Sequence, residues 1–139
     1  MSYLLDTNVI SEMRKRDRCN PGVVAWFDGV EVEDLFVSVL TIGELRKGVD
    51  SLARRDQDAA AKLNHWLCQV VIAFEDRILD VDSRVAEEWG RMNVSATLPT
   101  VDGLLAATAK RHRLTLVTRN TQDIARTGVS CLNPFEKNV

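Results

Sequence analysis

The sequence predicts an α/β protein, a three-layer α/β/α sandwich in which helices cover both faces of a central parallel sheet of about five strands. Two observations lead to this expectation. Short apolar segments rich in Val, Ile and Leu recur without polar alternation, which is typical of strands buried on both faces. Segments with helical spacing lie between them, and this alternation favours right-handed crossovers with helices on either side.

Five segments are expected to form the strands. Each is short and apolar, and most are followed directly by polar residues. They cover residues 3–5, 35–40, 78–81, 114–118 and 129–132. Because parallel strands end at the same edge of their sheet, ligands are expected beyond those carboxyl ends.

The segments between the strands carry apolar residues at helical spacing. One apolar stripe consists of Leu63, Trp66, Leu67, Val70, Val71 and Phe74. Similar stripes are formed by Val101, Leu104, Leu105, Thr108 and Ala109, and by Val85, Ala86, Trp89 and Met92. Charged residues occupy the opposite faces, so these helices are expected to cover the sheet with their apolar sides.

Length and charge limit what the protein can be. Its 139 residues, 45% of them hydrophobic, suffice for the core of one domain spanning residues 1–139. The formal net charge is −2, so no broad basic surface is available to bind a nucleic-acid backbone. Binding a polyanion would need divalent cations or a local basic group; Arg14, Lys15, Arg16 and Arg18 form either such a group or a solvated turn.

The cysteines and the apolar segments indicate a cellular compartment. Cys19, Cys68 and Cys131 are odd in number and far apart, so neither a disulfide framework nor a zinc site is expected. The first residues do not resemble a secretion signal, and no run of apolar residues is long enough to cross a membrane. We therefore expect a cytoplasmic protein without a membrane partner.

Polar residues follow the first strand abruptly, where Asp6, Thr7 and Asn8 begin a helix. One of these residue types is needed to cap that helix, and capping alone would explain one of them. After the second strand, Thr41 and Glu44 have the spacing of a capping box, in which the glutamate bonds back to the threonine amide. Asp102 lies in the first turn of another helix, where the helix dipole favours a carboxylate.

A fourth acid, Asp123, follows the strand that ends at Thr118, with Asn120 between them. Four separate segments thus supply carboxylates to one edge of the sheet, where like charges repel unless cations neutralise them. All-oxygen ligands suit Mg²⁺ or Mn²⁺, and the absence of paired His or Cys at ligand spacing argues against zinc. Such metals lower the pKa of a bound water and stabilise a leaving oxygen, so hydrolysis of a phosphodiester is the expected chemistry.

The chain resembles the PIN-domain ribonucleases, and within them the VapC-type toxins of bacterial toxin–antitoxin pairs. The segments that carry the resemblance are LLDTNVISE (4–12), SVLTIGEL (38–45), DGLLAATA (102–109), LVTRNTQD (116–123) and LNPFE (132–136). The resemblance implies a PIN-like fold and a metal-dependent endoribonuclease, in which a Mg²⁺-activated water, or one activated by Mn²⁺, attacks the scissile phosphate of RNA.

The resemblance also assigns roles to individual residues. The acidic positions that it matches as catalytic residues and metal ligands are Asp6, Glu44, Asp102 and Asp123, and the supporting residues are Thr7, Asn8, Thr118 and Asn120. The chain has Asn120 where the family often has Asp, and Ile124 where an aromatic residue often follows the last acid. The first departure favours one well-occupied metal site in the absence of RNA.

Family membership would bring further partners. It implies a cognate antitoxin that wraps the toxin and blocks its metal site, a homodimer, and contact with operator DNA only through that antitoxin. Two other readings remain open at the level of the sequence. One is a PIN-like binding module without catalysis, and the other is a phosphohydrolase of another parallel-sheet family, although Asn8 stands where such enzymes repeat an Asp.

Overall fold

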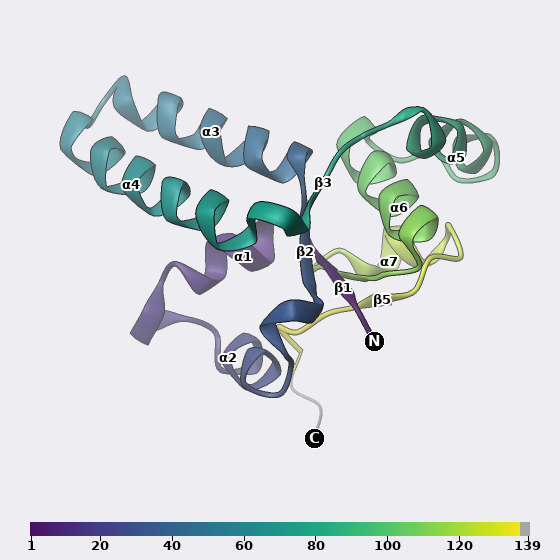
Figure 1. Ribbon diagram of the computed structural model, residues 1–139, viewed down its shortest axis with the longest axis horizontal. Coiled ribbons are helices and arrows are strands. Elements are labelled where there is room, and N and C mark those ends of the chain that lie inside the picture. The colour runs from purple at the N-terminus through teal and green to yellow at the C-terminus, as the bar shows by residue number, and fades with distance from the viewer. Residues whose placement is uncertain (137–139) are drawn as a thin grey trace.

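Five parallel strands form the central sheet of the computed structural model, which describes residues 1–136 (Figure 1). The strands are β1 (Tyr3–Leu5), β2 (Leu35–Ser38), β3 (Ile78–Leu79), β4 (Thr115–Val117) and β5 (Cys131–Leu132), in the order β3-β2-β1-β4-β5. In the parallel register, Tyr3 of the central strand lies opposite Leu35 on one side and Thr115 on the other. All strands therefore end at one edge of the sheet.

Helices cover both faces of this sheet. They are α1 (Thr7–Met13), α2 (Pro21–Asp28), α3 (Val39–Ala53), α4 (Gln57–Phe74), α5 (Ser83–Ser95), α6 (Thr100–His112) and α7 (Thr121–Ala125). Short 3₁₀ turns are η1 (Arg16–Arg18), η2 (Val32–Asp34) and η3 (Glu75–Arg77). Figure 1 shows α1 to α4 on one side of the strands and α5 to α7 on the other. The expected three-layer α/β/α fold with a parallel sheet is confirmed.

The two faces of β1 enter two different hydrophobic cores. Leu4 and Leu5 are both fully buried, and because successive side chains of a strand point to opposite faces, they belong to separate clusters. Leu4 packs with residues of α5 and α6, including Val85, Met92 and Leu105. Leu5 packs with residues of α1, α3 and α4, including Val9, Val49 and Leu67. This explains why the strand shows no polar alternation.

Several strands are shorter than the sequence suggested. The segment expected as a strand over residues 35–40 ends at Ser38, because the Ser38 hydroxyl accepts a hydrogen bond from the Leu40 amide at 3.0 Å and caps α3. Val39 and Leu40 are apolar residues suited to either structure, so their composition did not indicate the boundary. The expected strands at 78–81, 114–118 and 129–132 also shorten at one or both ends.

The packing of α5 on α6 fixes the position of the first turn of α6. A Cβ atom added to Gly103 would lie 2.9 Å from Nε1 of Trp89, so only glycine lets the Trp89 indole lie this close to the α6 backbone. That indole nitrogen is buried and has no hydrogen-bond partner within residues 1–136. The close approach holds the first turn of α6, and with it Asp102, against α5.

No helix within residues 1–136 combines the length and the apolar composition that a membrane span requires. Cys19, Cys68 and Cys131 are all free thiols.

Candidate active site

Asp6 occupies the point where β1 ends and α1 begins. Its backbone amide still belongs to the sheet, because it donates to the Val117 carbonyl at 2.9 Å. Its side chain already belongs to the helix, because Oδ1 accepts a hydrogen bond from the Thr7 amide at 2.7 Å. Only 9% of the residue is exposed to solvent. The expected cap of α1 is therefore Asp6 itself, and the capping bond occupies only one of its carboxylate oxygens.

The second oxygen of Asp6 is held by two side chains. Oδ2 accepts a hydrogen bond from the Thr118 hydroxyl at 2.8 Å and another from the Asn8 amide group at 3.3 Å. Thr118 is fully buried, and its hydroxyl oxygen accepts the Asn120 backbone N–H at 3.1 Å. Since that N–H occupies the hydroxyl as an acceptor, the hydroxyl proton is directed at Asp6. The carboxylate therefore has a defined orientation.

Burial raises the pKa of the Asp6 carboxyl above its ordinary value of 3.8. The hydrogen bonds from Thr118, Thr7 and Asn8 lower this pKa, while the nearby charge of Glu44 raises it again. The net direction is upward, so the ionised form of Asp6 is disfavoured in the metal-free protein. A cation at this edge would reverse that preference.

Glu44 reaches the same edge from α3. Its Oε1 accepts a hydrogen bond from the Thr7 hydroxyl at 2.5 Å, and that hydroxyl lies 3.4 Å from the buried Thr41 hydroxyl. The capping-box interpretation of Thr41 and Glu44 is therefore wrong, because Ser38 caps α3 and leaves both residues inside the helix. Glu44 is exposed, and its contact is with α1 rather than with its own helix.

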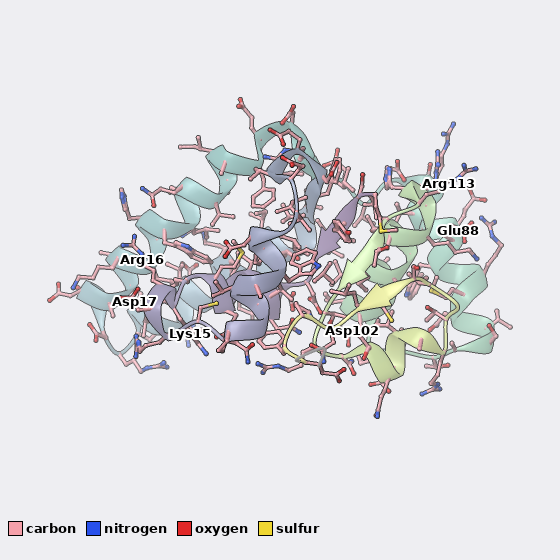
Figure 2. The ribbon with its side chains drawn as sticks, turned by 90° about the horizontal axis from the view of Figure 1, so that it is seen from below. Lys15, Arg16, Asp17, Glu88, Asp102 and Arg113 are labelled. Carbon is pink, nitrogen blue, oxygen red and sulfur yellow. The ribbon has the colours of Figure 1, made fainter. Side chains whose placement is uncertain are left out.

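Asp102 lies in the first turn of α6, as the sequence indicated. Its pKa is raised first by partial burial and then by the negative charges of Asp6, Glu44 and Asp123. Within the part of the chain that the structure describes, its carboxylate accepts no hydrogen bond that would compensate. Figure 2 shows this residue in the lower middle of the view, between the part of the molecule that carries Lys15 and the part that carries Glu88. The carboxylates of Asp6, Glu44 and Asp123 thus lie close enough to Asp102 to act on it electrostatically.

Asp123 and Asn120 are the least constrained of the sequence-predicted residues. Asp123 lies in the first turn of α7 with its side chain half exposed, and the Arg126 guanidinium is 4.0 Å from its Oδ1. Asn120 occupies the capping position of α7, yet its side chain makes no capping hydrogen bond. Both side chains can therefore turn toward a ligand without breaking a strong contact.

The donor chemistry at this edge fits a hard divalent cation, although the carboxylates are not gathered tightly. Within residues 1–136, no three acidic, His or Cys side chains lie close enough together to bind one ion directly. Mg²⁺ typically keeps several waters and takes only one or two carboxylates, so it does not require such a cage. Asp6 and Asp102, whose ionised forms are both disfavoured without a cation, fit this pattern.

None of the four acids lines either of two prominent clefts in the described part of the chain. A cleft of about 440 Å³ lies elsewhere, between α2 and the segment 132–136, and Trp26 and Leu132 are among its lining residues. A deep pocket is typical of sites for small molecules. An acidic edge outside such a pocket is better suited to an extended chain that lies across the surface.

Two charged residues near this edge were not singled out from the sequence. Glu12 on α1 is buried, and it accepts hydrogen bonds from Lys15 at 2.9 Å and from the Asn20 amide at 2.8 Å. These bonds lower its pKa, and they tie the end of α1 to the start of α2. Arg119 follows the buried Thr118 directly, and its guanidinium stacks on Phe135. Glu12, Arg119 and Phe135 all lie in the segments that carry the family resemblance, but the stacking of Arg119 on Phe135 joins two of those segments and leaves no local pattern in the sequence.

Comparison with protein families gives one match over most of the chain. A family model described as "PIN domain" matches residues 3–129. Two curated relatives cover nearly all of it. The sequence is 38% identical to Toxin FitB of Neisseria gonorrhoeae over 138 residues, which cover 95% of this chain and 97% of that protein. It is 30% identical to VapC ribonuclease Y4jK of Sinorhizobium fredii, with coverage of 96% and 97%.

A solved structure agrees with these relatives. The structure of FitAB bound to an IR36 DNA fragment contains a chain that superimposes on this protein with a TM-score of 0.88. The two chains are 35% identical, and the alignment covers 99% of this chain and 98% of the other. Similarity therefore extends over the whole sheet, the covering helices and the edge at which the four acids lie.

Proposed function

Because the chain belongs to the PIN-domain family, we propose that it is a metal-dependent endoribonuclease that acts as the toxin of a toxin–antitoxin pair. The proposal is supported by the names of two relatives, one a toxin and the other a VapC ribonuclease. The observation that supports the catalytic proposal best is the raised pKa of Asp102, caused in part by Asp6, Glu44 and Asp123. Clustered acids of this kind are suited to a divalent cation and to phosphoryl chemistry.

In this proposal, Asp6 and Asp102 bind Mg²⁺ or Mn²⁺ most directly, and Glu44 and Asp123 complete the negative surroundings. When bound, such a cation lowers the pKa of a water and stabilises the charge that develops on the leaving oxygen. The protein's own task is to hold Asp6 ionised and oriented, which its bonds from Thr118 and Asn8 support. Neither bond requires a movement of the backbone.

The remaining supporting residues act around these acids. The Thr7 hydroxyl holds the Glu44 carboxylate at the edge and so limits its rotation. Asn120 offers an amide where an acid would add a further charge, so we propose one well-occupied metal site in the absence of RNA. A second cation would then enter only together with the phosphates of the substrate, which is a common arrangement for Mg²⁺.

The test of this function is RNA cleavage by the purified protein under controlled metal concentrations. We expect fragments of total RNA to appear with Mg²⁺ or Mn²⁺ and to disappear when excess chelator is added, because the acids alone cannot stabilise the leaving oxygen. Adding back Mg²⁺ should restore the rate. Equal cleavage with and without chelator would contradict the metal mechanism. Absence of cleavage under every condition would favour the non-catalytic binding module instead.

Thr118→Val tests the proposed support of Asp6. Valine has nearly the same shape but can neither donate to Asp6 nor accept the Asn120 amide, so Asp6 loses its main orienting bond. Cleavage is expected to fall about 10- to 100-fold, as is typical when a residue behind a metal ligand is removed. Thr118→Ser keeps the hydroxyl and should retain most of the rate. Initial cleavage rates at saturating Mg²⁺ decide between these outcomes, and equal rates for Val and Ser would refute the role.

We further propose that a cognate antitoxin binds this protein and places a basic side chain at the acidic edge. The relative FitB is named a toxin, and the FitAB complex is described as bound to DNA. The acidic chain itself carries no broad basic field, so contact with operator DNA would come through the antitoxin. A homodimer belongs to the same proposal. The three free thiols fit a reducing compartment, and we propose the cytoplasm as its site of action.

A further inference from the structure

Arg119 is held from three directions directly beside the carboxylate edge. Its backbone amide donates to Oδ1 of Asn8 at 3.4 Å, and its carbonyl accepts a hydrogen bond from the Asn133 amide group at 3.3 Å. Its guanidinium carbon lies 3.8 Å from the centre of the Phe135 ring. The same Asn8 side chain also donates to Asp6, so Arg119 and the proposed catalytic acid share one neighbour.

The segment beneath Arg119 is itself well anchored. Asn133 accepts the Phe135 amide at 2.9 Å in a local turn, and Pro134 between them is buried. The Pro134 carbonyl packs closely on α2, where a Cβ atom at Gly22 would lie only 2.5 Å away. Because this segment is fixed to α2, the Phe135 ring offers the guanidinium a defined surface. Stacking of this kind restricts the side chain without neutralising its charge.

Arg119 forms no ion pair within residues 1–136. No carboxylate lies within 4.0 Å of its guanidinium in the described part of the chain, and the residue is exposed. The charge of Arg119 is one of the causes that lower the pKa of Glu12. Glu12 is, however, already bonded to the Lys15 ammonium at 2.9 Å. An exposed, oriented guanidinium therefore remains available for an anion outside the protein.

We propose that Arg119 binds a backbone phosphate of the RNA next to the scissile one, and that Phe135 holds its guanidinium in place for this contact. The inference rests on the proposed ribonuclease function. A planar guanidinium matches two phosphate oxygens and can stack on a ring at the same time. Because Arg119 and Asp6 both bond to the Asn8 side chain, while the guanidinium is turned onto Phe135, the phosphate that Arg119 reaches is a neighbour of the one at Asp6. Arg119 is thus a substrate-binding residue that fixes the path of the RNA strand across the protein surface.

The experiment measures RNA affinity without cleavage. Every protein carries Asp6→Asn, and binding is followed by fluorescence anisotropy with a labelled single-stranded RNA of mixed sequence and with labelled total transfer RNA. The variants are Arg119→Gln, Arg119→Lys and Phe135→Leu. The control is Arg84→Gln, an exposed arginine on α5 beside the far end of α6, which lies about 15 Å from Asp102 along that helix.

Arg119→Gln is expected to weaken RNA binding about tenfold, the usual scale of a charged hydrogen bond. The slope of log affinity against log salt should become shallower by about 0.7, which corresponds to one lost phosphate contact on a single strand. Arg119→Lys should keep the slope while losing part of the affinity, because its charge remains. Phe135→Leu should weaken binding about threefold through the loss of preorganisation. Arg84→Gln should change neither quantity.

Two results would overturn the inference and can be told apart from a failure of the proposed function. If the Arg119 variants bind as tightly as their parent and with the same salt slope, while urea denaturation shows only a loss of stability, the stacked pair merely fastens the segment 132–136. If the parent protein binds neither RNA at any salt concentration, the proposed ribonuclease function fails, and the inference about Arg119 fails with it.

Discussion

Asp6→Asn is expected to reduce RNA cleavage by about three orders of magnitude, equivalent to about 4 kcal/mol in the barrier, while the protein stays folded. Asparagine removes the charge that, in the proposed mechanism, holds a cation at the end of β1. It is also a good helix cap, so the bond from the Thr7 amide can persist at Oδ1. Cleavage rates of total RNA in Mg²⁺, together with circular dichroism spectra, measure both halves of this expectation.

The matched control is Asp56→Asn, between α3 and α4. Asp56 caps α4 as Asp6 caps α1, and its carboxylate accepts the Ala59 amide at 3.0 Å. It has no neighbouring acid in the proposed site, so its replacement should leave the cleavage rate unchanged. Full activity of the Asp6 variant would remove this carboxylate from the mechanism. A loss that both variants share would mean that a damaged cap, rather than a lost ligand, explains the result.

Asp102→Asn is expected to change activity and metal-free stability in opposite directions. Cleavage should fall at least about 100-fold, because a proposed ligand of the cation is lost. In excess chelator, however, the variant should be more stable than the original protein, since it no longer adds a charge beside Asp6, Glu44 and Asp123. Asp102 is only partly buried and solvent screens its charge, so the expected gain is about 0.5 kcal/mol.

The pH dependence of stability follows from the raised pKa values of Asp6 and Asp102. A folded-state pKa above the unfolded one means that the folded protein holds these protons more tightly. Their contribution to stability is therefore best at low pH and is lost as pH rises from about the ordinary value of 3.8 through the raised value. Mg²⁺ at neutral pH should recover that loss and raise Tm, and this rise should be much smaller in Asp102→Asn.

Urea denaturation with chelator at neutral pH, and thermal melts with and without Mg²⁺, measure these effects. Asp58→Asn is the control, because Asp58 is also in the first turn of a helix but is exposed and away from the acidic edge. There the carboxylate benefits from the helix dipole, so its removal should slightly destabilise the protein. A loss of stability in both variants would show that Asp102 serves its helix rather than a metal site.

The fold could be predicted from short apolar patterns in the sequence because the sheet is buried on both faces. Leu4 and Leu5 enter different cores, so neither could be polar, and the strand appears in the sequence as an uninterrupted apolar run. The stripe along α4 was equally visible because one face of that helix packs on the sheet. The ends of the strands could not be predicted as well. Ser38 ends β2 through a hydrogen bond to Leu40, and the residues on either side are all apolar.

The proposed site residues differ in how far the sequence predicted their positions. Asp6, Asp102 and Asp123 follow apolar segments or begin helices, so the topology of a parallel sheet already sends them to one edge. Glu44 illustrates the limit, since its spacing from Thr41 suggested a local bond, whereas its carboxylate bonds to the Thr7 hydroxyl of another helix. A bond between residues 37 positions apart leaves no periodic signal in the sequence.

The sequence by itself determined the parallel sheet, its covering helices and the acids that the ends of its strands present, because burial and helix capping act on neighbouring residues and leave short-range patterns. Only the tertiary structure decided which atoms meet. It directs the Thr118 hydroxyl at Asp6, turns Glu44 toward Thr7, and stacks Arg119 on Phe135. These contacts join segments far apart in the chain, and their geometry depends on how whole elements pack rather than on any local preference.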